Sequence, residues 1–117
     1  MLVGALLNIA ALRDDIARSR PAEVLLVCAG TFETFALEDA IAAGLLAAEF
    51  PDAELTDAAT AAIATARQFS TALDGLHAAR NGRALAARGW QDQIEWCAQV
   101  SRFGTIGAMN GGIIRSL

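Results

Sequence analysis

The sequence contains no lysine and no tyrosine, and all nine of its basic residues are arginines. The lack of lysine excludes a Walker A phosphate loop, a Schiff-base lysine and a lysine general base. Charged residues make up only 19% of the chain and hydrophobic residues 55%, which excludes a disordered tail and predicts a folded chain. The net charge of −4 argues against a nucleic-acid partner, because such binding depends on Lys and Arg at phosphates.

Cysteine is scarce, and Cys28 and Cys97 lie far apart and outside any CxxC pair. This spacing lacks the signature of a zinc or thioredoxin-type site, so we expect two reduced, buried thiols, with a structural disulfide as the minor alternative. The N-terminus carries no basic segment ahead of an apolar stretch, and no apolar run approaches the ~20 residues of a membrane span. We therefore expect a cytoplasmic protein with no membrane partner.

The apolar pattern predicts one domain over residues 1–117 that is predominantly helical. Apolar residues recur at helical spacing in five stretches, over residues 5–17, 37–50, 56–70, 71–79 and 91–100. A turn at Asn81-Gly82 is expected to lead into one further helix that ends near Arg88. Weak strands are expected at Leu2-Val3 and in a hairpin through Gly111-Gly112.

One segment favours a strand of a different kind. Glu23–Cys28 is a short run of apolar and β-branched residues between Pro21 and Gly30, typical of a strand covered on both faces in a parallel sheet. One such strand cannot make a sheet. The sequence therefore predicts neighbouring strands from an upstream segment or from a partner chain.

The loop that leaves this strand holds the strongest candidates for chemistry, because ligands of α/β sheets collect at the carboxyl ends of strands. The backbone amides of Gly30 and Thr31 either contact a phosphate or form an ordinary turn. Glu38 and Asp39 follow at a helix start, where they either complement the helix dipole, worth about 0.3–1 kcal/mol, or hold Mg²⁺. Arg83 either belongs to a turn or offers a planar fork to an anion.

Other familiar catalytic arrangements are missing. A cysteine phosphatase loop needs Arg six positions after its Cys, whereas Thr34 follows Cys28 at that distance. His77, the one histidine, lies mid-helix between apolar neighbours and is expected to have a structural role. The chain has no HExxH or GxGxxG motif and no Ser-His-Asp order, which removes the metalloprotease, dinucleotide-binding and serine hydrolase interpretations.

Six segments together resemble the 2-phosphosulfolactate phosphatase family, in their order and rough spacing. They are GALLNIAAL (Gly4–Leu12), VLLVCAGT (Val24–Thr31), FALEDAIAAG (Phe35–Gly44), LTDAA (Leu55–Ala59), NGRAL (Asn81–Leu85) and DQIEWCAQ (Asp92–Gln99). The resemblance covers the C-terminal half of that family, whose other half is expected upstream. One departure is Ala36, where the family usually has the Ser of a capping box.

The resemblance implies an α/β fold with a three-layer helix–sheet–helix arrangement. It also implies Mg²⁺-dependent hydrolysis of 2-phosphosulfolactate to sulfolactate and phosphate, on the route to coenzyme M. Within the matching motifs, we expect Glu38 and Asp39 to be catalytic and to hold Mg²⁺. We expect Gly30, Thr31 and Arg83 to bind a small anionic phosphoester.

A second hypothesis belongs to a different class of protein. The scarcity of strands in an apolar chain is also typical of a noncatalytic structural or interaction module, which would need a partner chain or a missing segment. This hypothesis predicts self-association or binding to an N-terminal half.

Overall fold

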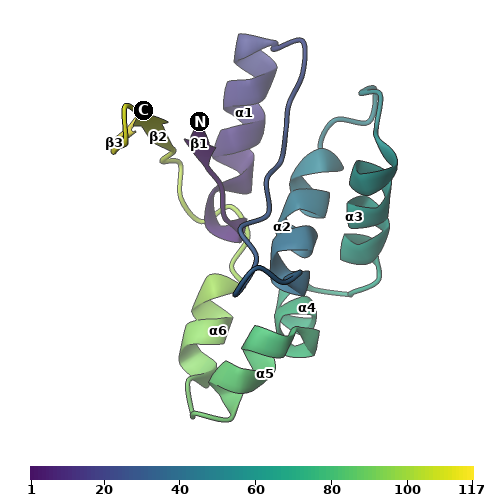
Figure 1. The fold of residues 1–117 in the computed structure, drawn as a ribbon, viewed down its shortest axis with the longest axis vertical. Coiled ribbons are helices and arrows are strands. Elements are labelled where there is room, and N and C mark those ends of the chain that lie inside the picture. The colour runs from purple at the N-terminus through teal and green to yellow at the C-terminus, as the bar shows by residue number, and fades with distance from the viewer.

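Short strands at the two ends of the chain flank six helices (Figure 1). The computed structural model describes all of residues 1–117. The helices are α1 (Ile9–Ser19), α2 (Leu37–Ala47), α3 (Asp57–Arg67), α4 (Ala72–Ala78), α5 (Arg80–Ala86) and α6 (Gln91–Cys97), and a 3₁₀ helix, η1 (Leu6–Asn8), precedes α1. The strands are β1 (Leu2–Val3), β2 (Gly107–Asn110) and β3 (Ile113–Ser116). The α/β class, with helix predominating and few strands, is confirmed.

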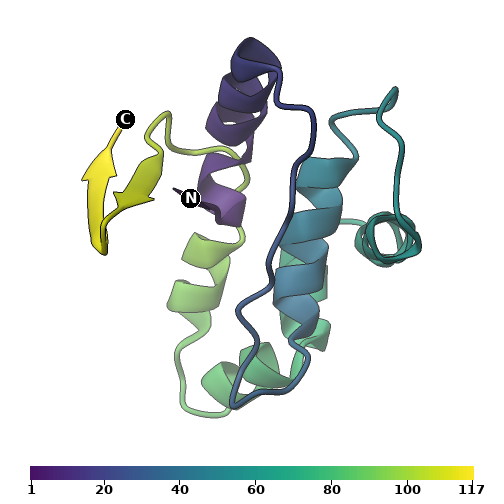
Figure 2. The same ribbon diagram turned by 45° about the horizontal axis from the view of Figure 1, so that its top comes forward.

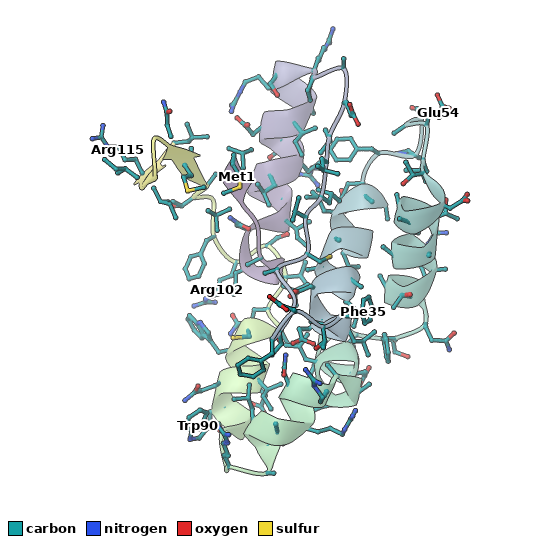
Figure 3. All side chains as sticks on the ribbon, in the orientation of Figure 1. Met1, Phe35, Glu54, Trp90, Arg102 and Arg115 are labelled. Carbon is teal, nitrogen blue, oxygen red and sulfur yellow. The ribbon has the colours of Figure 1, made fainter.

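The three strands form one antiparallel sheet in the order β1-β2-β3. It lies beside α1, on the side away from α2 and α3 (Figures 1 and 2). Gly111 and Gly112 both have positive φ angles, 57° and 79°, as a two-residue type I′ hairpin turn requires. Figure 3 shows Met1 next to this hairpin, where its carbonyl accepts a hydrogen bond from the Met109 amide at 2.7 Å. The expected weak strands and hairpin are confirmed.

The core lies where α1, α2, α4 and α6 meet. Ile41 of α2 and Ile94 of α6 are its most deeply buried large side chains, each 1% exposed. The apolar face of α1 contributes Ile9 and Leu12, and Leu76 comes from α4. The helical spacing of apolar residues in the sequence therefore did identify the buried faces.

Glycines permit two close helix contacts. A Cβ atom on Gly44 of α2 would lie 2.1 Å from the Ala62 carbonyl oxygen in α3, and one on Gly82 of α5 would lie 1.7 Å from the Leu76 carbonyl oxygen in α4. The expected turn at Asn81-Gly82 is wrong, because both residues lie inside α5. The chain turns earlier, at Ala79, and Gly82 is needed for the close approach of α5 to α4.

The helix starts expected near residues 37, 56, 71 and 91 are confirmed, and capping side chains explain two of them. The helix expected from residue 5 begins later, at Ile9, after the 3₁₀ helix η1. Thr56 accepts a hydrogen bond from the Ala59 amide at 3.2 Å, and Thr71 forms a capping box with Asp74. Ala36 offers no such bond at the start of α2, and the Thr34 hydroxyl does not replace it, because it donates to the Thr31 carbonyl.

The strand expected at Glu23–Cys28 is not formed. After a bend at Ala22 the chain runs extended to Ala29 (Figures 1 and 2), and none of the backbone groups of residues 21–29 takes part in a backbone–backbone hydrogen bond. The segment runs between α1 and α2 along the molecule (Figures 1 and 2). The physical reason is the lack of a neighbour, since β1, β2 and β3 pair only with one another.

The two cysteines are free, but both are exposed rather than buried as expected. Cys28 lies on the unpaired segment, whose outer face nothing covers, and Cys97 ends α6. No helix of this fold is both long enough and apolar enough to cross a bilayer.

Candidate functional site

A tight loop follows the unpaired segment. Thr31 and Thr34 form an isolated antiparallel bridge, with backbone hydrogen bonds of 3.0 and 3.1 Å in both directions. Phe32 and Glu33 between them have positive φ angles of 48° and 59°. Non-glycine residues in this conformation cost of order 1–3 kcal/mol each, and such strain concentrates at functional sites.

Asp39 ties this loop to the first turn of α2. Its Oδ2 atom accepts a hydrogen bond of 2.7 Å from the backbone amide of Gly30. A negative charge in the first turn of a helix is itself favourable. The expected proximity of the loop and the acidic pair is therefore observed.

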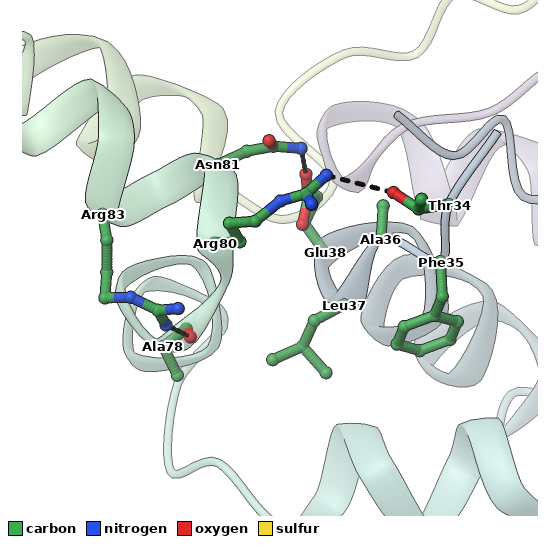
Figure 4. Close-up of a pocket in the computed structure, with 9 residues that line it drawn as sticks. All are labelled: Thr34, Phe35, Ala36, Leu37, Glu38, Ala78, Arg80, Asn81 and Arg83. Atoms are coloured by element: carbon green, nitrogen blue, oxygen red, sulfur yellow. Dashed lines mark hydrogen bonds between the residues drawn. The ribbon is translucent and has the colours of Figure 1, made fainter. Parts of the chain in front are cut away.

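The first turn of α5 meets the Gly30–Thr34 loop and the first turn of α2, and these three parts form a polar corner. The Asn81 side-chain amide donates hydrogen bonds to Glu38 Oε1 and, at 2.7 Å, to Thr31 Oγ1. The Arg80 guanidinium donates to Thr34 Oγ1 at 3.1 Å. Residues that are some 45 positions apart in the sequence are thus bound directly to one another. Figure 4 shows two of these bonds, from Asn81 to Glu38 and from Arg80 to Thr34.

A pocket of about 360 Å³ opens at this corner (Figure 4). Its polar lining consists of Thr34, Glu38, Arg80, Asn81 and Arg83. The three ion pairs of the chain all involve α1 residues, so neither arginine of the pocket is paired with a carboxylate. The Arg83 guanidinium donates instead to the Ala78 carbonyl at the end of α4. Both cations therefore remain available to balance the charge of an anion.

The start of α2 adds backbone donors to the pocket. The first amide with an acceptor within this helix is that of Ala40, which donates to the Ala36 carbonyl, and residues 37–39 have none. Since Ala36 provides no capping side chain, these amides point out of the helix end without a partner. By contrast, the amides of Gly30 and Thr31 already donate to Asp39 and Thr34. The helix start is thus better placed than the loop to bind an anion.

Cys28 lies close to this corner but is poorly suited to act as a nucleophile. Partial burial raises the pKa of its thiol, and the negative charge of Asp39 raises it further. The reactive form of a cysteine is the thiolate, which a raised pKa disfavours at neutral pH. This electrostatic environment agrees with the absence of a cysteine phosphatase loop.

All five residues singled out in the sequence lie in this region. Gly30, Thr31, Glu38 and Asp39 are joined through hydrogen bonds, and Arg83 lines the same pocket. Sequence reasoning missed the roles of Arg80 and Asn81, because it placed Asn81 in a turn. Their signal was the pair of polar residues just ahead of Gly82: Asn81 opens the NGRAL segment and Arg80 directly precedes it.

The carboxylates near the pocket are the candidate ligands for Mg²⁺, which prefers oxygen ligands. No group of three or more His, Cys, Asp or Glu side chains gathers anywhere in the fold. Mg²⁺ in enzymes of phosphate chemistry is usually bound by only one or two carboxylates, with waters and substrate oxygens. Glu38 could be one such ligand because it lines the pocket, whereas Asp39 does not line it. Of the carboxylates in this region, Glu38 is therefore the one that could hold Mg²⁺ at the pocket.

Comparison with known proteins gives a consistent result. Residues 1–112 match the family model of 2-phosphosulpholactate phosphatase. The 2-phosphosulfolactate phosphatase of Methanothermobacter thermautotrophicus is 31% identical over 113 residues, which are 97% of this chain and 49% of that protein. A probable 2-phosphosulfolactate phosphatase of Symbiobacterium thermophilum is 34% identical over 103 residues, 84% of this chain and 44% of that protein. The chain thus spans about half the length of these relatives, and it belongs to the 2-phosphosulfolactate phosphatase family.

Proposed function

We propose that this chain forms part of a Mg²⁺-dependent phosphatase that hydrolyses 2-phosphosulfolactate to sulfolactate and phosphate, a reaction on the route to coenzyme M. The observation that carries the proposal is the corner where Glu38, Asn81 and the Thr31–Thr34 loop meet at a pocket with two unpaired arginines. Family membership supports the same reaction class, since the relatives are named as phosphatases.

The proposed substrate carries a phosphate, a sulfonate and a carboxylate, whereas the chain has a net charge of −4. Binding therefore requires a local reversal of the electrostatic potential. The free amides at the start of α2 would bind the phosphate, where the helix dipole also favours negative charge. Arg80 and Arg83 would bind the remaining anionic groups.

The two carboxylates take different roles in this proposal. Glu38 would hold Mg²⁺, oriented by the Asn81 amide at its Oε1 atom. When bound, Mg²⁺ supplies neutralisation of the phosphoryl charge and polarisation of a phosphoryl oxygen. Asp39 would fix the Gly30–Thr34 loop through its bond to the Gly30 amide, so that the strained loop keeps its shape beside the substrate.

The test is phosphate release from 2-phosphosulfolactate, by the chain itself and by a chimera in which the chain replaces the aligned residues of the Methanothermobacter relative. We expect the chimera to release phosphate with Mg²⁺ and to stop when a chelator removes the metal. Activity unchanged by EDTA would rule out the metal role.

Substitutions in the chimera test the two carboxylates together. Glu38→Gln combined with Asp39→Asn is expected to lower the rate at least a hundredfold, about 2.7 kcal/mol of transition-state stabilisation. Glu33→Gln is the matched control, because Glu33 lies in the same loop, is exposed and does not line the pocket. Equal rates for the double variant and this control would show that neither Glu38 nor Asp39 takes part in catalysis.

A noncatalytic interaction module is the second candidate. It is favoured by the unpaired, exposed Pro21–Ala29 segment, which needs a partner whatever the chemistry of the pocket. A chimera that folds, binds Mg²⁺ and yet releases no phosphate would favour this candidate over the enzyme.

A further inference from the structure

Large apolar side chains are exposed along one stretch of the chain, just before α2. The exposed fractions are 46% for Val24, 80% for Leu25, 77% for Val27, 93% for Phe32 and 75% for Phe35. Figure 3 places Phe35 beside the start of α2, directly after the Thr31–Thr34 loop. Scattered single apolar residues are ordinary on a surface, but a row of this kind marks an interaction site.

The backbone of the first part of this stretch, residues 21–29, is unpaired along both edges. No N–H or carbonyl between Pro21 and Ala29 bonds to another backbone group, although the segment is extended. Apolar residues occur at adjacent positions 24–28 rather than at alternate ones, a pattern typical of a strand that is buried on both faces. The segment thus has the composition of a central strand and the surroundings of a loop.

One face of the segment is already partly covered. Leu26 is half-buried and packs against the core that α1 and α2 share. A mainly apolar groove of about 1020 Å³ lies between the segment and the helices α2 and α3. The open face of the segment is formed by Leu25 and Val27, which are mostly exposed to solvent, and Leu25 also borders the groove.

We propose that Ala22–Cys28 is a strand-docking site, paired on both edges by strands from the part of the family protein that this chain does not cover. The relatives match this chain over 84–97% of its length, yet contain about as many residues again. A protein of their length therefore carries the same segment together with a further half, and the open face and groove provide an apolar surface for that half.

A second copy of this chain is a poorer occupant. A two-fold pair of identical strands lies antiparallel and uses one edge of each strand, so that the other edge stays open. Both edges of Ala22–Cys28 are unpaired, which calls for two neighbouring strands from one occupant. The proposal does not depend on the proposed activity, and its readout is structural.

The experiment is amide hydrogen exchange on the isolated chain and on the chimera with the Methanothermobacter relative. We expect the amides of Glu23–Cys28 to exchange at least about 100-fold more slowly in the chimera, because a paired central strand opens only through larger unfolding. The amides of Ile113–Ser116, which lie in β3 at the outer edge of the sheet, serve as the internal control and should change little.

Each other outcome contradicts the proposal. A chimera that melts cooperatively but leaves Glu23–Cys28 exchanging at the rate of the isolated chain would show that the other half docks elsewhere. Protection of this segment in the isolated chain that rises with its concentration would identify a second copy as the occupant. A chimera that fails to fold, while the isolated chain and the relative both fold, would show that this surface does not accept the other half.

A matched pair of substitutions sharpens the result. Val27→Pro removes a strand hydrogen bond donor, and we expect it to abolish the protection gained in the chimera. Ile114→Pro makes the same change in β3, where Ile114 is also exposed, at 58%. Retained protection of Glu23–Cys28 in the Val27→Pro chimera would contradict strand pairing.

Discussion

Residues 22–28 and residues 30–39 are adjacent in the sequence, yet only the second stretch is held by hydrogen bonds to the rest of the chain. Gly30, Thr31, Thr34, Glu38 and Asp39 all have partners within the fold. The backbone of the first stretch has none. The polar corner is therefore built by this chain alone, whereas the apolar strand depends on neighbours from elsewhere.

The difference follows from the range of the contacts. The loop closes on itself between Thr31 and Thr34, and α5 needs only a close contact with α4 to bring Asn81 to Glu38. A strand, by contrast, satisfies its backbone only through another strand. A chain that spans half the length of its relatives can thus form the polar corner by itself, while residues 22–28 stay without strand neighbours.

The largest expected loss of stability comes from a shift of α5, which would disrupt the polar corner and leave residues 22–28 unchanged. Gly82→Ala brings a Cβ atom to 1.7 Å from the Leu76 carbonyl oxygen, so α5 must shift and carry Asn81 away from Glu38. We expect the free energy of unfolding in urea to fall by about 1–3 kcal/mol. Gly104→Ala is the control, because nothing lies within 4 Å of its Cβ position. Equal stability of the two variants would refute the close α4–α5 contact.

A smaller effect is expected when the corner loses one polar link. Asn81→Ala leaves α5 in place but removes the bonds to Glu38 and Thr31, and we expect a loss of about 1–2 kcal/mol by thermal unfolding. Gln93→Ala, at an exposed position of α6, should cost less than about 0.5 kcal/mol. A cost for Asn81→Ala as small as that of the control would mean that the corner is not held by this amide.

The third prediction concerns Cys28, at the border between the two stretches. Partial burial and then the Asp39 charge raise the pKa of this thiol, so Asp39→Asn should lower it and speed alkylation by iodoacetamide near neutral pH. The measurement is the pH dependence of alkylation in a Cys97→Ser background, with Asp92→Asn as the control. Because the folded-state pKa is raised, the contribution of Cys28 to stability is present at neutral pH and lost as the pH rises through that pKa. An unchanged pKa of Cys28 in the Asp39→Asn variant would show that the Asp39 charge does not act on this thiol.

The smallest effect is expected on the open face of the strand segment. Leu25→Ser should change the free energy of unfolding of the isolated chain by less than about 0.5 kcal/mol, because Leu25 is 80% exposed. Leu26→Ser, its half-buried neighbour, should cost more, because Leu26 packs against the core. Equal costs at the two positions would mean that the segment is covered on both faces within this chain.

Most helices and the C-terminal hairpin could be predicted from the sequence, because apolar periodicity and capping residues act locally. The prediction failed at Asn81-Gly82, where a residue pair typical of turns serves a tight helix contact that only the packed structure reveals. It also failed at Glu23–Cys28, whose composition specifies a strand but cannot supply its neighbours. The loop and the acidic pair were found together because they are close in the sequence. Arg80 and Asn81 were missed because only the packing of α5 brings them to this loop.

The most direct test of a preformed corner beside an unfinished strand is residue-resolved amide exchange on the isolated chain, followed by NMR. We predict slow exchange for the amides of Gly30 and Thr31, which donate to Asp39 and the Thr34 carbonyl, and near-random-coil exchange for Val24, Leu25 and Val27. Fast exchange at Gly30 and Thr31, or slow exchange at Val24–Val27 in the dilute monomer, would contradict it.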